Sequence, residues 1–128
     1  MRPRYADLFQ RMRDPDPILS DAAFDAVLFD REEAIPDLVE CYDRARKDDE
    51  LRFLAVQLLG FSGSRKAIPA LIAALDDWDP KVRAEACRSL EDIDARETIP
   101  VLEARLVDLD ELVRVAAAEA ILELRKTA

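Results

Sequence analysis

Neighbouring carboxylates are the side chains in this 128-residue sequence with the clearest capacity for chemistry. Grouped carboxylates can hold a divalent cation, attract a basic partner, or cap the N-termini of helices. A calcium loop needs a glycine and a distal glutamate at fixed positions, and the group at 76–79 lacks both. Helix capping and attraction of a basic partner are therefore the favoured interpretations. The groups are Glu32-Glu33, Asp48-Asp49-Glu50, Asp76-Asp77-Asp79, Glu91-Asp92-Asp94 and Asp108-Asp110-Glu111.

Catalytic chemistry has little support in the sequence. It contains no histidine, the commonest general base and metal ligand, and no glycine-rich nucleotide-binding motif. Cys41 and Cys87 lack metal-binding spacing, and both fall on apolar helical faces where cysteine acts as a small hydrophobic residue. A nucleophilic Cys87 would have only Arg83 and Arg88 nearby to activate it. We therefore expect no enzymatic activity, no cofactor and no metal.

Composition narrows the class of protein. Half of the residues are hydrophobic, which argues against disorder, and only two are glycine, which leaves little material for hairpin turns. Acidic residues outnumber basic ones 28 to 19, for a net charge of −9, so nucleic acid is not an expected partner. No apolar run approaches the roughly 18 residues of a membrane span. We expect an all-α protein of the cytoplasm that does not bind a membrane.

An internal repeat organises the chain. Arg52, Arg83 and Arg114 stand 31 residues apart, and the residues around them repeat in step. An aspartate lies four residues before each arginine and an alanine three residues after it. A fixed period of this size is typical of stacked-repeat proteins. The aspartates are Asp48, Asp79 and Asp110, and the alanines are Ala55, Ala86 and Ala117.

Two motifs mark where the helices begin. The pattern small-Ile-Pro-x-Leu begins at Ala34, Ala67 and Thr98, and proline is tolerated in the first turn of a helix, so each motif predicts the start of a helix A. The aspartate before each arginine predicts the N-cap of a helix B. Apolar residues at every fourth position then line one face of helix B. Those stripes are Leu51-Ala55-Leu59, Val82-Ala86-Leu90 and Val113-Ala117-Ile121.

The motifs divide the chain into helix pairs within a single domain, 1–128. Residues 1–33 are expected to form a degenerate capping pair, with helices at 5–13 and 19–29, because terminal repeats need a soluble outer face. Its register is open: an offset of 32 aligns Leu19, Ala23 and Val27 with the next stripe, and 33 aligns Ile18, Ala22 and Ala26. The expected repeats are 34–63, 64–94 and 95–128, with helices at 34–46 and 49–60, 65–75 and 79–91, and 98–107 and 111–125.

Over residues 34–124 these motifs resemble HEAT repeats, in particular the short bacterial type of phycobilisome-lyase-like proteins. The resemblance implies a right-handed α/α superhelix, an α-solenoid of about four two-helix repeats with the B helices along its concave face. It also implies a ladder in which aspartates and arginines join neighbouring turns. The ladder residues would be Asp48 and Arg52, Asp79 and Arg83, and Asp110 and Arg114.

Residues that differ between repeats are the candidates for partner binding. On helix B the direction opposite the apolar stripe holds Phe53 and Gln57 in one repeat, with Ala84 and Arg88, then Val115 and Glu119, at the matching positions. Leu122, three residues after Glu119, points in the same direction. The alternative to partner binding is that Phe53, Val115 and Leu122 pack laterally on the next repeat. Trp78, in a turn among acids, either folds over the following helix or is an exposed anchor. The candidates are Phe53, Gln57, Trp78, Ala84, Arg88, Val115 and Glu119.

The expected function is binding of another protein through the concave face, assisted by an acidic rim that suits a basic partner. Two alternatives stay open. The acidic balance also suits an immunity-type inhibitor of a basic toxin or nuclease. The family resemblance also suggests an accessory subunit of a phycobilin lyase-like system, although no bilin-handling motif is visible.

Overall fold

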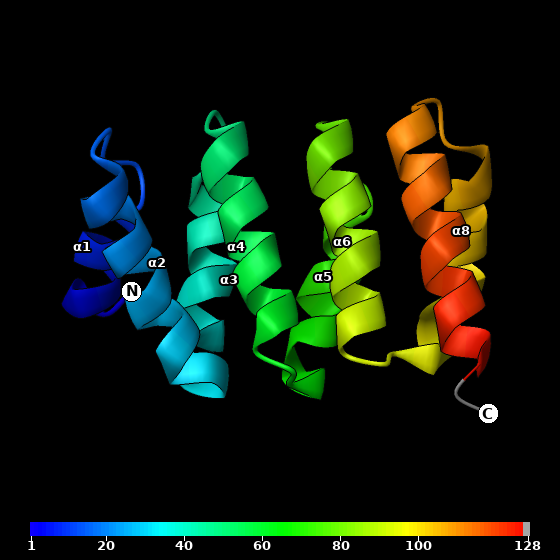
Figure 1. Ribbon diagram of the computed structural model, residues 1–128, viewed down its shortest axis with the longest axis horizontal. Coiled ribbons are helices and arrows are strands. Elements are labelled where there is room, and N and C mark those ends of the chain that lie inside the picture. Colours follow the sequence, from blue (N-terminus) through cyan, green and yellow to red (C-terminus); the bar gives the residue numbers. More distant parts are fainter. Residues whose placement is uncertain (127–128) are drawn as a thin grey trace.

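The computed structural model describes residues 1–126 and contains helices and no strands over that range (Figure 1). Each predicted helix is present, with bounds that differ from the expected ones by a few residues. The α-helices are α1 (Pro3–Arg11), α2 (Pro17–Asp30), α3 (Ile35–Arg44), α4 (Asp49–Phe61), α5 (Ile68–Ala74), α6 (Pro80–Asp92), α7 (Ile99–Ala104) and α8 (Glu111–Lys126); the 3-10 helices are η1 (Arg31–Ala34), η2 (Arg65–Ala67), η3 (Arg96–Thr98) and η4 (Arg105–Val107). Short 3-10 helices precede α3, α5 and α7, and another follows α7.

The helices form an all-α solenoid. Four helix pairs follow one another along the long axis of the molecule (Figure 1), with the A helices α1, α3, α5 and α7 in one layer and the B helices α2, α4, α6 and α8 in the other. The most extensive contacts join α4 to α6 and α6 to α8, so contacts between B helices account for much of the packing of one repeat on the next. The pair α1–α2 and the pair α7–α8 lie at opposite ends.

The structure confirms the sequence motifs that predicted where the helices begin. Isoleucine begins α3, α5 and α7, and the proline after it lies in the first turn, where its missing N–H has no intrahelical partner. The carboxylates of Asp16, Asp48 and Asp79 accept hydrogen bonds from backbone amides at the starts of α2, α4 and α6. Local sequence therefore determines where each helix begins.

The core follows the predicted B-helix stripes. Ala55, Ala86 and Ala117 are fully buried, which lets the two layers approach closely. In α2 the side chains of Ala23 and Val27 are buried while Ile18 is exposed, so the first pair follows the offset of 32. No helix within residues 1–126 is both long and apolar enough to cross a membrane.

The chain leaves each of the first three B helices through a residue in left-handed or otherwise positive-φ geometry. The φ angles are 49° at Arg31, 66° at Gly63 and 59° at Asp94. Only one of the three is glycine, the residue that adopts positive φ without steric penalty. A positive φ angle thus recurs after each of these helices although the residue type changes.

Candidate functional site

Arg52 joins one helix pair to the next. Its Nε and Nη2 atoms donate to the two carboxylate oxygens of Asp77 at 3.0 and 3.2 Å. Its Nη1 donates to the backbone carbonyls of Ala45 and Arg46 at 2.9 and 2.8 Å. Burial alone would raise the pKa of the Asp77 carboxyl, but hydrogen bonds from Arg52 and Tyr42 hold that pKa below its usual value. Arg52 and Asp77 therefore form a buried ion pair that connects two successive helix pairs.

Arg83 repeats this arrangement one step along the solenoid. Its Nε and Nη2 atoms donate to Asp108 at 3.1 and 3.0 Å, and its Nη1 donates to the carbonyl of Asp77 at 2.7 Å. A planar guanidinium can hold a carboxylate and a turn carbonyl at once, which a lysine cannot. Arg52 and Arg83 therefore connect successive repeats, the role that the family resemblance implied for them. Within residues 1–126 the Arg114 guanidinium, in contrast, donates only to the carbonyl of Asp108 in its own turn.

The expected aspartate partners of this ladder need correction. Asp77 and Asp108 bind the arginines, whereas Asp79 and Asp110 cap the B helices that follow. In each Asp-x-Asp turn the first carboxylate also accepts the amide of the second aspartate, at 2.9 and 3.0 Å. That bond turns the first carboxylate away from the helix and toward the preceding repeat. Asp48 combines both roles in α4 because its turn has a different length.

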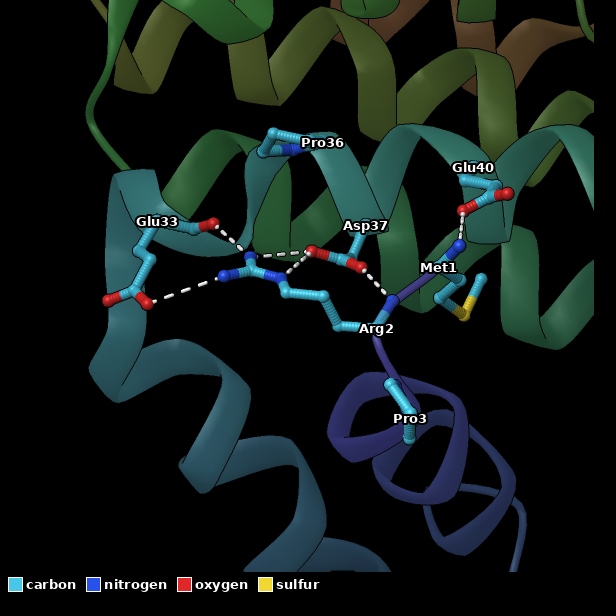
Figure 2. A pocket seen from close by; sticks show the side chains of 7 residues that line it. All are labelled: Met1, Arg2, Pro3, Glu33, Pro36, Asp37 and Glu40. Carbon is cyan, nitrogen blue, oxygen red and sulfur yellow. Dashed lines mark hydrogen bonds and ion pairs between the residues drawn. The ribbon is translucent and has the colours of Figure 1, made fainter.

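The first helix pair is attached to the second by other contacts. Arg13 Nε donates to Asp48 at 2.8 Å, and the guanidinium of Arg2 binds Asp37 through Nε at 2.9 Å and through Nη2 at 2.6 Å. Arg2 also donates to the carbonyl of Glu33 at 2.8 Å. Figure 2 shows the Arg2 side chain directed toward Glu33 and Asp37, among the residues that line an open hollow of about 710 Å³. Because these charged groups bind one another, we interpret the hollow as part of the contact between the first two helix pairs rather than as a ligand site.

Sequence reasoning missed the Arg2–Asp37 joint, although a signal for it was present. Asp37 occupies the variable position of the Ile-Pro-x-Leu motif, where the other repeats carry Ala70 and Val101. Burial alone would raise the pKa of the Asp37 carboxyl, but hydrogen bonds from Arg2 keep that pKa below its usual value. A charged residue at an otherwise apolar repeat position predicts a specific partner.

The position shared by Phe53, Ala84 and Val115 does not face a common groove. Phe53 is partly buried against the core, Ala84 is fully buried, and Val115 is 47% exposed. The expectation that Ala84 is available to a partner is wrong, because α8 packs on α6 and covers it. Val115 is exposed because no helix within residues 1–126 covers the outer side of α8. This position faces the next repeat.

The position shared by Gln57, Arg88 and Glu119 does reach solvent in all three B helices. Around it the structure gathers an excess of carboxylates along α6 and α8. Arg88 contacts Glu85 at 3.5 Å. Burial and the negative charges of neighbouring acids raise the pKa of Glu91. We call this surface the acidic B-helix face; it consists of Arg88, Glu91, Asp92, Glu119 and Glu123, with the buried Glu85 in contact with Arg88.

The carboxylates of the acidic B-helix face are only partly compensated. Burial is the main cause that raises the pKa of Glu85 and of Asp92 as well. A raised carboxyl pKa means that the surroundings disfavour the ionised form of these two side chains.

Trp78 lies on the rim formed by the A–B turns. Its side chain is 69% exposed, its ring lies over the Arg52 guanidinium with 5.2 Å from Cζ to the ring centroid, and its Nε1 donates to Asp49 at 3.2 Å. It therefore contacts the preceding repeat, rather than folding over its own helix, and leaves ring surface free. Val107 and Leu109 are exposed on the next turn of the same rim. Hollows of about 360 and 410 Å³ flank Trp78.

No group of three or more Asp, Glu or Cys side chains within residues 1–126 is arranged to hold a metal ion. In the Asp76–Asp79 turn, Asp77 binds Arg52 and Asp79 caps α6, so their oxygens already have partners. These contacts account for that acidic cluster in structural terms.

Both cysteines are free and buried, and burial raises the pKa of each thiol to about 12. We expect Cys41 and Cys87 of the native protein to react with a small thiol reagent about 100-fold more slowly than those of the unfolded chain, because the thiolate is the reactive form. Absorbance of the released chromophore, with and without denaturant, measures this. Rapid labelling of the native protein would contradict the buried placement.

Comparison with known proteins gives the same architecture. A family model described as HEAT repeats matches residues 5–79 and 68–127. Among solved structures, the chain is similar to one from the complex of CpcE and CpcF of phycocyanin lyase from Nostoc sp. PCC7120, with a TM-score of 0.53 and 20% sequence identity. The match covers 98% of this chain and 66% of that one. No curated protein is detectably similar in sequence. At this identity the structural likeness shows the fold alone.

Proposed function

Because the chain belongs to the HEAT-repeat family, whose model matches nearly all of it, we propose that it is a non-enzymatic module that binds a basic segment of another protein. The acidic B-helix face is the proposed contact surface. The solenoid presents it on packed helices, so little conformational entropy is lost on binding.

The crowding of carboxylates around Arg88 is the observation that carries this proposal. Glu119 and Glu123 on α8 contribute to the raised pKa of Glu91 on α6, so negative charge from two repeats converges on one place. A lysine or arginine of a partner would relieve that repulsion and lower the pKa values. Binding of this kind is fast and falls with rising salt concentration.

Trp78 is the proposed second contact. An exposed indole held by one hydrogen bond and one guanidinium is a rigid apolar surface, and tryptophan is the residue type most enriched among binding hot spots. The neighbouring Asp76 is exposed and keeps the rim acidic. A partner with an apolar residue near its basic segment would contact both surfaces.

The test compares two double substitutions on B helices, each removing two carboxylates spaced four residues apart. With the native partner captured from host lysate and identified by mass spectrometry, Glu119→Gln/Glu123→Gln is expected to weaken binding about tenfold in calorimetry, or about 1.4 kcal/mol. The matched control, Asp21→Asn/Asp25→Asn on α2, should leave the Kd unchanged. Equal weakening by both variants would mean that only net charge matters, and no weakening by either would reject the surface.

A second candidate is an accessory subunit that acts with a bilin lyase. The likeness to a chain of the CpcE–CpcF complex favours it. Under this alternative the purified chain, alone or with its captured partner, would shift the absorbance spectrum of added phycocyanobilin. An unchanged spectrum in both cases would remove it.

A further inference from the structure

The arginine–aspartate ladder has an unused acceptor at the N-terminal end. Asp14 stands two residues before the N-cap Asp16 and accepts its amide at 2.8 Å. Asp77 and Asp108 accept the amides of Asp79 and Asp110 in the same way. Asp14 is therefore the equivalent of the two carboxylates that bind Arg52 and Arg83, yet within residues 1–126 no side chain forms an ion pair with it.

The ladder has an unused donor at the other end. Arg114 Nη1 donates to the carbonyl of Asp108 at 2.7 Å, as Arg83 Nη1 donates to that of Asp77. In Arg52 and Arg83 the Nε and Nη2 atoms then bind an aspartate of the following repeat. In Arg114 these two donors have no carboxylate partner in the described part of the chain.

Apolar surface accompanies each unused group. On the outer side of α8, Val115 is 47% and Leu122 is 60% exposed. The same two positions in α6 are Ala84, which α8 covers, and Glu91, whose pKa responds to acids of α8. Val115 and Leu122 thus occupy the surface that one repeat presents to the next. They form an apolar ridge beside Arg114.

The outer side of α1–α2 is hollow where a preceding repeat would lie. A depression of about 290 Å³ opens there, and Asp14 is among its lining residues. Most of the lining is apolar, and Leu19 is half exposed. The lining residues are Leu8, Arg11, Asp14, Leu19, Ala22 and Ala23.

We propose that copies of this chain associate head to tail, with the outer side of α8 of one copy against the hollow on α1–α2 of the next. Arg114 of the first copy pairs with Asp14 of the second, and Val115 and Leu122 pack against the hollow. A second copy is the occupant because both halves of the joint, matched in charge and in apolar character, are present on this one sequence.

The two surfaces lie at opposite ends of the solenoid (Figure 1), so the contact is heterologous and each addition leaves a free end. Such contacts produce open chains, or rings where the rotation closes. The net charge of −9 on each copy opposes association, so moderate salt should promote it by screening that repulsion. Glu119 of the acidic B-helix face lies on the same side of α8, four residues after Val115 and three before Leu122. The variants below change only Arg114 and Asp14, neither of which belongs to that face, and the readout is self-association, so the test does not depend on the proposed function.

Sedimentation velocity over a concentration series tests the proposal by charge reversal. Wild-type protein should form species larger than a monomer, and Arg114→Asp or Asp14→Arg alone should weaken association by about tenfold or more. The double variant Arg114→Asp/Asp14→Arg restores an opposite-charge pair and should recover association. Arg125→Asp, a reversal elsewhere on α8, is the control.

Circular dichroism melts of each variant separate loss of folding from loss of association. A wild type that stays monomeric throughout the series would overturn the proposal. So would single variants that associate like the wild type, or a folded double variant that fails to recover.

Discussion

Replacement of Arg52 by alanine is expected to lower the free energy of unfolding by about 3–5 kcal/mol, the usual cost of removing one partner of a buried ion pair. The variant leaves the buried Asp77 carboxylate with Tyr42 but without its guanidinium, and it leaves the carbonyls of Ala45 and Arg46 without this donor. Urea unfolding followed by circular dichroism measures the loss. It is the largest effect we expect from a single polar side chain here.

The three repeat arginines provide an internal control for this prediction. Arg83 makes the same kind of pair with Asp108 but is more exposed, so Arg83→Ala should cost about 2 kcal/mol. Arg114 has one hydrogen bond to a carbonyl, so Arg114→Ala should cost about 1 kcal/mol. If Arg52→Ala costs no more than Arg114→Ala, the ladder does not hold the layers together.

The fold was predictable because its signals are local and recur. Proline in the first turn and aspartate at the N-cap act within a few residues, so both motifs located helix starts without any knowledge of packing. The stripe around Ala55, Ala86 and Ala117 predicted the core for the same reason. Because the pattern recurs at a constant spacing, each copy also predicts where the helices of the next repeat begin. A single sequence was therefore enough to predict the fold.

The details of the ladder were less predictable because they depend on side-chain direction. From sequence, the carboxylates of Asp77 and Asp79 are equally good acceptors for the arginine of a neighbouring repeat. The structure separates them through a single amide bond from Asp79 to Asp77, which orients the first carboxylate toward Arg52. Spacing alone contains no information about that bond.

The candidate surface was predicted in part. Helical arithmetic gave the solvent-reaching position at Gln57, Arg88 and Glu119, since it needs only the angle between residues on one helix. It failed for Ala84, because whether an outward residue is covered depends on the neighbouring repeat. Trp78 required knowledge of Arg52 in the preceding repeat. Contacts between repeats are where sequence reasoning loses accuracy.

A close approach between the B helices α4 and α6 leads to the second large prediction. Gly60 of α4 faces Ser89 of α6, and a Cβ atom added at Gly60 would lie 2.5 Å from Ser89 Oγ, 2.6 Å from its Cβ and 2.9 Å from its Cα. Ser89 is fully buried and donates to the carbonyl of Val56 at 3.1 Å, so it cannot rotate away without losing that bond. The α4–α6 crossing therefore requires glycine.

We expect Gly60→Ala to lower the free energy of unfolding by about 2 kcal/mol. In an ordinary helix this change would stabilise the protein by about 1 kcal/mol. Here the added methyl overlaps backbone as well as side-chain atoms of Ser89, and such overpacking costs about 1–3 kcal/mol beyond the lost gain. Urea unfolding of the wild type and the variant gives the difference, and a stabilised Gly60→Ala would contradict the crossing geometry.

A double-mutant cycle identifies the cause of the loss. Ser89→Gly removes two of the three overlapping atoms, so it should recover part of the stability lost in Gly60→Ala, with a coupling of about 1 kcal/mol. Gly63→Ala is the contrasting variant, because its Cβ would meet no atom within 4 Å but its φ is 66°. It should cost about 1 kcal/mol through the backbone alone. Since that cost involves no contact with Ser89, Ser89→Gly should leave it unchanged, which separates steric overlap from backbone conformation.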